Sequence, residues 1–350
     1  MANQATDIST SRTAAPPAPI AEYAVKPVSP RSLSVKVRYG DRVYGAVTFL
    51  ASLSIFGIIF WLIWQLTGAS LQSIHHTGLS FITKSLWDEE ADQYHALPFI
   101  FGTLYSSFIA LVLAVPVSIG AAIFLSELAP RWIRTPATFL IELLAAIPSV
   151  VYGLWGIFVL IPWLKIYFIK PVIRSGLPHM PVLGALFHGD SSGYSMLAAG
   201  MILAIMVTPF ITAVTRDILR AIPRSQREGS YALGATKWET ISQVVTPYAK
   251  SGIIGAVILG LGRALGETMA VTMVIGNQSP NTASGVSFSL FSSGYTMASV
   301  LANKFNEAIP GLNQSALVEI ALVLFVVTIV VNICARLLVF YTAKDIQGGK

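Results

Sequence analysis

The chain contains six apolar segments, each close to the roughly 20 residues that a helix needs to cross a bilayer. They lie at about 43–66, 98–125, 136–162, 195–218, 250–276 and 315–340. Hydrophobic residues make up 54% of the sequence and charged residues 11%, whereas a soluble domain carries roughly 25% charged residues. Only helices and closed barrels satisfy their backbone hydrogen bonds within lipid. We therefore predict an all-α integral membrane protein with six transmembrane helices.

The first 42 residues differ in composition from the rest of the chain. Residues 1–42 are rich in Ala, Pro, Ser and Thr and show no hydrophobic periodicity, which predicts a disordered tail. The apolar run at 43–66 is longer than the roughly 7–15 apolar residues of a cleavable signal peptide, so we expect an uncleaved first transmembrane helix. Residues 98–340 are expected to form one membrane core.

The distribution of basic residues predicts the orientation of the chain. Most of its 23 Lys and Arg residues lie in the tail, near 131–134, across 216–250 and at the C-terminal end. The positive-inside rule then places both termini and the 219–249 loop in the cytoplasm. The basic residues of the outer segments are Lys84, Lys165, Lys170, Arg174 and Lys304. Topology thus accounts for the net charge of +6, and no nucleic-acid partner is expected.

The cytoplasmic loop has the pattern of two short helices. Pro223 suits the first turn of a helix, and Gly234 suits a left-handed stop. Thr236 and Glu239 have the spacing of a capping box at the start of a second helix, which Pro247 is expected to end. A simple helical hairpin would show the same pattern.

Two charges lie inside the fifth apolar segment, which we expect to be one long helix. Arg263 and Glu267 are four residues apart, so they share a helical face and can pair. Each costs about 2.5–3.5 kcal/mol at mid-membrane, so we expect both to face a helix interface or a water-filled path. The Gly262–Gly266 spacing permits close contact with another helix. Two interpretations stay open: a buried pair that fixes packing, or an arginine of an anion path held by its own carboxylate.

Two further carboxylates lie in predicted spans, and one acidic run lies outside. Glu142 and Glu319 could each be a paired or interfacial carboxylate or could have a transport role. The run Trp87–Asp92 in the first outer segment either docks a partner or is simply solvated. The five His residues do not show metal-ligand spacing, so we expect no metal.

The chain contains no G-x-x-x-x-G-K-[ST] sequence, which is the loop that cradles nucleotide phosphates. A transporter of this sequence is therefore expected to take its energy from another subunit or from an ion gradient. We expect no cofactor in this chain.

The spacing of Glu228, Gly234 and Pro247 resembles the "EAA loop" of bacterial ABC importer permeases. The chain departs from that pattern in having Gly229-Ser230 where Ala-Ala is usual and Thr246 where Leu is usual. More specific are GRALGETMAVTMVIGN, from Gly262, and ELLAAIPSVVYGLWG, from Glu142. With these stretches the chain resembles, from about residue 97 to residue 338, the PstC-type permease subunits of phosphate-specific ABC transporters.

This resemblance implies a type I ABC importer permease fold in the bacterial cytoplasmic membrane, and inorganic phosphate as substrate. It implies that Arg263 and Glu267 line the substrate pathway and that Glu228, Gly234 and Pro247 belong to the segment that couples to an ATPase. The implied partners are a PstA-type permease, a PstB-type ATPase dimer that binds ATP and Mg²⁺, and a PstS-type phosphate-binding protein.

Three other functions stay open. The chain could be the permease for another oxyanion, such as sulfate or molybdate. It could be an ion-coupled secondary anion transporter, although such proteins often show two repeated halves and GRALGET occurs once. It could be an intramembrane enzyme, although no nucleophile, base and orienting residue stand out together. Phosphate is chemically plausible, because near pH 7 it still carries a proton and can therefore donate a hydrogen bond to a carboxylate such as Glu267, which sulfate cannot do.

Overall fold

The computed structural model describes residues 39–175, 180, 184–189, 192–278 and 286–347. The predicted tail, up to residue 38, lies outside the described residues. The chain forms two units, Met1–Ile58 and Ile59–Lys350. The described part of the first unit is the beginning of helix α1 (Tyr39–Thr77), whose side chains there are exposed. α1 extends beyond the predicted 43–66 because no proline interrupts it before Gly78, whose φ of +54° provides a left-handed stop.

The second unit is almost entirely helical. It begins with α2 (Ser80–Thr83) and a two-stranded antiparallel hairpin of β1 (Trp87–Asp88) and β2 (Gln93–Tyr94). The next helical elements are α3 (Leu97–Ile123), η1 (Phe124–Leu128), α4 (Arg131–Ala146), α5 (Ser149–Trp155), η2 (Gly156–Leu160), α6 (Ile161–Leu164), η3 (Lys165–Ile169), α7 (Lys170–Arg174) and α8 (Gly184–Phe187). They are followed by α9 (Met196–Ala221), α10 (Arg224–Ala232), α11 (Lys237–Glu239), η5 (Thr240–Val245), α12 (Thr246–Leu265), α13 (Met269–Val274), α14 (Met297–Lys304), η6 (Phe305–Glu307) and α15 (Leu312–Gln347).

The described residues contain six helices that are long and apolar enough to cross a membrane, which confirms the predicted number. They are Gly40–Thr77, Leu97–Leu128, Ser149–Arg174, Met196–Ala221, Lys237–Leu265 and Leu312–Phe340. The chain is therefore a multi-pass membrane protein.

The third of these helices is not where the sequence placed it. The predicted span at 136–162 is broken at Ile147 and Pro148, whose ψ angles of 131° and 139° are not helical. The residue before a proline is sterically disfavoured in the helical region, so α4 ends at Ala146 and a new helix starts at Ser149. Pro136, expected at a helix start, lies inside α4. The span itself runs to Arg174, into the segment predicted as an outer loop.

Four prolines follow wider, π-helical turns. In the described residues, each of the π-helical segments η1, η2, η3 and η5 ends two residues before a proline. Those prolines are Pro130, Pro162, Pro171 and Pro247. Proline lacks an N–H and its ring clashes with the carbonyl four residues earlier, and the π turn moves that carbonyl out of register. At three of the four sites the helix therefore continues through the proline.

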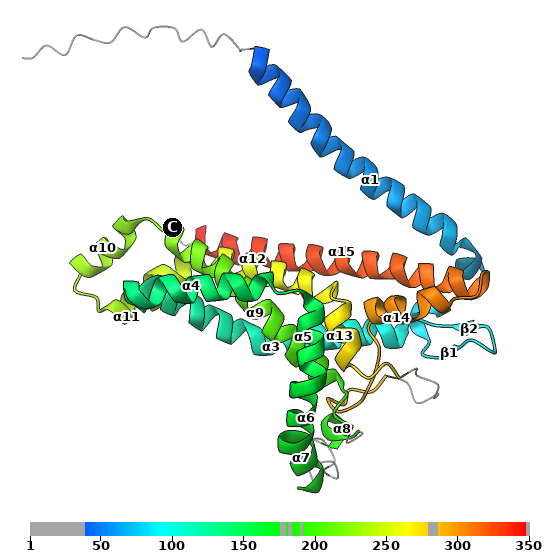
Figure 1. Cartoon of the computed structure of the whole chain (residues 1–350). Helices are drawn as coiled ribbons and strands as arrows, with labels where there is room; N and C mark the ends of the chain where they lie inside the picture. Colours follow the sequence, from blue (N-terminus) through cyan, green and yellow to red (C-terminus); the bar gives the residue numbers. More distant parts are fainter. Residues whose placement is uncertain (1–38, 176–179, 181–183, 190–191, 279–285, 348–350) are drawn as a thin grey trace, which may run out of the picture. The chain divides into compact units, whose positions relative to one another are not determined.

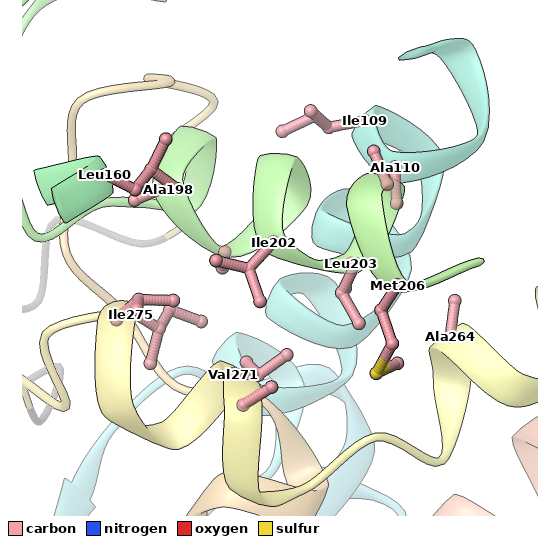
Figure 2. Close-up of a cluster of buried hydrophobic side chains, with 14 of the residues drawn as sticks. Ile109, Ala110, Leu160, Ala198, Ile202, Leu203, Met206, Ala264, Val271 and Ile275 are labelled. Atoms are coloured by element: carbon pink, nitrogen blue, oxygen red, sulfur yellow. The ribbon is translucent and has the colours of Figure 1, made fainter. Parts of the chain in front are cut away.

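The core of the second unit is centred on α9. Figure 2 shows Ile202, Leu203 and Met206 of α9 between side chains of α3 and of α13. Ile109 of α3 and Val271 of α13 are among the buried residues of this cluster. Because lipid is as apolar as these side chains, close packing, and not removal from water, is what holds such helices together.

Close approach between α12 and α9 depends on two glycines of α12, Gly252 and Gly260. A Cβ added at Gly260 would lie 2.7 Å from Ile211 and 2.9 Å from Val207 of α9. Within the described part of this chain, no helix approaches Gly262 or Gly266 as closely: a Cβ at Gly262 would meet only Asn332 Oδ1, at 3.9 Å, and Gly266 lies past the end of α12.

The second unit has two distinct ends (Figure 1). The β1–β2 hairpin lies at one end, and α10 and α11 lie at the other, close to the C-terminal end of α15. The segment predicted to be cytoplasmic and the C-terminus are thus on the same side, as the orientation predicted from basic residues requires.

Candidate functional site

The segment between α9 and α12 folds as the sequence predicts. α10 ends at a corner in which Gly234 has a φ of +83°. The capping box then starts α11, since Thr236 Oγ1 accepts a hydrogen bond from the Glu239 N–H and Glu239 Oε2 accepts one from the Thr236 N–H. Two short helices therefore meet at a fixed left-handed corner. We call residues 223–239 the corner segment.

The corner segment presents apolar side chains to its surroundings. Leu233 is 90% exposed and Trp238 67% exposed, and Tyr231 is also exposed. Glu228 is exposed beside them, and a Cβ at Gly234 would meet nothing within 4 Å. An exposed apolar group of this kind, rimmed by charge, is typical of a protein interaction surface.

The prediction that Pro247 ends the second helix is wrong. The helix runs from Lys237 through η5 into α12 without a break. The Thr246 N–H bonds to Ile241 O, five residues back, so the π turn is complete before the proline is reached. The corner segment is therefore joined to the fifth membrane helix by continuous helix, which lets a displacement of one move the other.

The corner segment is fastened to the rest of the unit by Arg227, which no pattern in the sequence had indicated. Arg227 of α10 forms a 2.7 Å ion pair with Glu127 of η1, and it donates to the carbonyl oxygens of Ile222 and Leu219 at 2.8 Å. Glu127 and Arg227 are 100 residues apart, and both are largely buried. No local pattern in the sequence could link them.

Arg263 and Glu267 do not lie on one helix. α12 ends at Leu265, Gly266 caps it, and α13 begins at Met269. Glu267 Oε1 accepts a hydrogen bond from the Ala270 N–H at 3.2 Å, in the manner of a helix cap. No ion pair joins the two side chains in the described part of the chain, so the predicted pairing is wrong. The reason is Gly266: its low helix propensity permits the break that separates them.

Arg263 instead lies on the exposed side of α12, near side chains of α9 and α5. Its guanidinium carbon lies 5.9 Å from the centre of the Phe210 ring of α9, which is cation–π distance. It is also within electrostatic reach of the Tyr152 hydroxyl of α5. Arg263 is exposed on the chain taken alone, whereas Glu267 is half-buried. The end of α12 thus offers one accessible positive charge beside a break in a membrane helix.

Glu142 is ion-paired and lies outside the six candidate spans. It belongs to α4, and its Oε1 accepts hydrogen bonds from both terminal nitrogens of Arg216 of α9 at 3.3 Å. Arg216 is 5% exposed and also donates to Asp217 at 2.9 Å. Of the alternatives for Glu142, the paired carboxylate is therefore confirmed. The pattern of the sequence had not indicated Arg216 as its partner.

Glu319 lies inside the last candidate span and is 6% exposed, so it is buried within this chain. It faces Ser73 at the end of α1, one turn from the place where Ser315 Oγ donates to Ala69 O. This arrangement ties α15 to the part of α1 that belongs to the second unit.

A group of three or more His, Cys, Asp or Glu residues that could hold a metal is absent from the residues that the structure describes. Glu228 and Gly234 belong to the corner segment, and Pro247 follows it. Arg263 and Glu267 lie on either side of the break in the membrane helix. The candidate site thus has two parts, joined by η5 and α12.

These features define a class: a polytopic membrane subunit in which a broken, charged membrane helix continues into an exposed two-helix segment. The family described as "Binding-protein-dependent transport system inner membrane component" matches residues 114–347. The chain belongs to this family.

Curated relatives agree with this assignment. The chain is 45% identical over 301 residues to the phosphate transport system permease protein PstC of Haemophilus influenzae, covering 85% of this chain and 93% of that protein. It is 43% identical over 296 residues to PstC of Mesorhizobium japonicum, covering 85% and 89%. The resemblance to PstC-type permeases is confirmed.

The fold is shared with ABC importers of known structure. A chain of a bacterial alginate ABC transporter, crystallised with an alginate pentasaccharide-bound periplasmic protein, superposes with a TM-score of 0.56. The two chains are 14% identical, and the superposition covers 84% of this chain and 93% of the other. At that identity the likeness shows the ABC importer permease fold alone.

Proposed function

We propose that the chain is the permease subunit of an ATP-driven importer that carries inorganic phosphate across the cytoplasmic membrane. The observation that carries this proposal is the continuous helix from Lys237 to Leu265, which joins the exposed corner segment to the charged break at Arg263. The relatives are named as phosphate transport permeases, which indicates phosphate as the substrate. The exposed guanidinium of Arg263 fits an anion.

ATP hydrolysis takes place in a partner, a PstB-type ATPase dimer that binds ATP and Mg²⁺, and this chain itself is not an enzyme. The exposed side chains of Leu233 and Trp238 are the residues that enter a groove of that ATPase. Gly234 sets the angle between the two helices that carry them, and Glu228 adds charge to the rim of the contact.

The substrate reaches this chain from the side opposite the corner segment. The corner segment and both termini face the cytoplasm, in keeping with the basic residues at 216–250, and the β1–β2 hairpin faces outward. A PstS-type binding protein delivers phosphate there. A PstA-type permease completes the path, because Arg263 is exposed on this chain taken alone and an intramembrane charge does not face lipid.

The break after Leu265 is where the anion passes. Arg263 offers positive charge to it, and Glu267, which is already bonded to the N–H of Ala270, limits how long a deprotonated anion stays. The O–H of hydrogen phosphate can donate a hydrogen bond to this carboxylate, whereas sulfate has no O–H to donate. Glu267 would thereby favour phosphate over sulfate.

Copurification and uptake test the proposal together. The tagged chain, purified in mild detergent, should bring with it a second permease and an ATPase. Proteoliposomes of that complex with the binding protein should take up radiolabelled phosphate only when ATP is supplied on the side of the corner segment. Uptake of sulfate or molybdate in place of phosphate would refute the substrate, and uptake driven by an ion gradient without the ATPase would refute the mechanism.

A further inference from the structure

A polar contact between α4 and α9 lies next to the corner segment and is not used by the path described above. Arg134, Thr138 and Glu142 of α4 follow one another at intervals of four residues and so share one helical face. Glu142 contacts Arg216 of α9, and Arg220, one turn further along α9, is within electrostatic reach of Arg134. We call these five residues the α4–α9 seam.

One half of the seam is fully bonded. Arg216 is 5% exposed, its Nε donates to Asp217 at 2.9 Å, and its terminal nitrogens donate to Glu142 at 3.3 Å. Two carboxylates therefore hold this guanidinium in place. All three of its nitrogens are already engaged with these carboxylates.

The other half of the seam has donors without acceptors. Arg134 donates from one terminal nitrogen to Ser126 O at 3.0 Å, but its Nε is buried and has no hydrogen-bond partner among the described residues. The same holds for Thr138 Oγ1. Leaving a buried donor unpaired costs about 1–3 kcal/mol. A ligand with several acceptor oxygens would satisfy both groups.

The charge of the seam also favours an anion. Arg134, Arg216 and Arg220 face two carboxylates, Glu142 and Asp217, so positive charge is in excess. Arg220 is exposed and forms no ion pair within the described residues. Its guanidinium is therefore available for a ligand that approaches along α9.

The seam lies beyond Arg263 in the direction of the cytoplasm. Arg263 contacts Phe210 of α9, and Asp217 lies seven residues later on the same face of that helix. Asp217 is followed by Arg220 and then by α10. An anion that leaves Arg263 along α9 toward the corner segment would reach the seam next.

We propose that the α4–α9 seam is a second anion subsite, which binds a small tetrahedral oxyanion such as phosphate at the cytoplasmic end of the path. Arg220, Arg134 Nε and the Thr138 hydroxyl donate to the anion. Arg216 is a positioning residue that keeps α4 and α9 in register through Glu142. The inference rests on the proposed function in one respect, namely that an oxyanion travels past Arg263.

The seam is connected to the corner segment. Glu127, the partner of Arg227 of α10, lies in η1, which leads directly into α4. A displacement of α10 by the ATPase would therefore move α4 relative to α9 and open the seam. Release of the anion would then be coupled to the same motion that the corner segment transmits.

Equilibrium binding of radiolabelled inorganic phosphate tests the proposal. The assembled complex, in lipid nanodiscs without the binding protein and without ATP, is compared with variants made in an Arg263→Gln background, so that the seam is measured by itself. We expect one saturable site in that background. Adding Arg220→Gln should raise its Kd at least tenfold, and Thr138→Val should raise it severalfold. Arg220→Lys, which keeps the charge, should stay within about threefold.

Arg131→Gln is the matched control, because Arg131 is an exposed arginine on the same helix α4. It should leave the Kd unchanged, and the Arg220→Gln complex should copurify with its partner subunits in the same ratio as the parent, which shows that the complex is intact. An unchanged Kd for phosphate in the Arg220→Gln variant would overturn the proposal, as would loss of all binding in the Arg263→Gln background alone. Either result would mean that the seam is occupied by solvent and is not a phosphate site.

A failure of the proposed function gives a different pattern. If the complex carries sulfate or molybdate, phosphate fails to bind, and labelled sulfate or molybdate binds with the same dependence on Arg220. The substrate assignment would then be wrong and the second subsite right.

Discussion

Arg263 and Glu267 are separated by the end of a helix, although only three residues lie between them. Arg263 is in the last turn of α12, and Glu267 bonds the N–H of Ala270 at the start of α13. A continuous helix would have placed them one above the other as an ion pair. Because the helix is broken, the arginine is not neutralised by Glu267.

This separation predicts that the two residues contribute independently to stability. Glu267→Ala removes a cap-like hydrogen bond at the start of α13 and should cost about 1 kcal/mol. Arg263→Met should change stability little. In a double-mutant cycle, followed by thermal unfolding of the purified protein, the coupling energy should stay below about 0.5 kcal/mol. A coupling of several times that size would mean that the side chains form a pair.

Gly234→Leu should uncouple ATP hydrolysis from transport. A φ of +83° costs a residue with a side chain roughly 1–2 kcal/mol, so the corner opens. The space around it is empty, so the protein should still assemble. Gly234→Asn is the control, since Asn tolerates the left-handed region, and it should keep most uptake. Normal ATP-driven uptake by a well-expressed Gly234→Leu variant would argue against a role for the corner.

Cysteine labelling should place the two ends of the second unit on opposite sides of the membrane. In a Cys334→Ser background, which removes the exposed native cysteine, an impermeant thiol reagent should modify Ser225→Cys of α10 only from the cytoplasmic side. It should modify Ser287→Cys only from outside. Both native residues are exposed. Labelling of the two positions from the same side would contradict the orientation.

The outer end of the second unit should lose stability in mild acid because of His95. Burial, and then the charge of Lys84, lowers the pKa of His95 below its usual 6.5. A lowered folded-state pKa means that its stabilising contribution is complete above pH 6.5 and is lost as the pH falls through the folded-state value. The melting temperature should therefore fall below pH 6.5. His95→Gln should reduce that fall, whereas His76→Gln, at an exposed histidine, should not.

The parts of the fold that depend on local chemistry could be predicted from the sequence. The number of spans follows from apolar length, the corner at Gly234 from its neighbours, and the Thr236–Glu239 capping box from a spacing of three residues. Each of these depends only on residues within a few positions of one another.

The parts that depend on proline and on distant residues could not be predicted in the same way. Pro148 and Pro247 look alike in the sequence, yet the helix breaks at the first and continues through the second, which follows a π turn. The ion pairs of Arg216 with Glu142 and of Arg227 with Glu127 join residues 74 and 100 positions apart. Only the packing of α4, η1, α9 and α10 brings them together.

Phosphate uptake by variants of Arg263 tests the central claim most directly. Arg263→Gln, and the double variant Arg263→Met with Glu267→Leu, should assemble with the other subunits, because in the described part of the chain no ion pair joins the two side chains across the helix break. ATP-driven uptake per assembled complex should fall to background in both, since the accessible positive charge at the end of α12 is gone. Near-normal uptake by either variant would contradict the account and exclude Arg263 from the anion path.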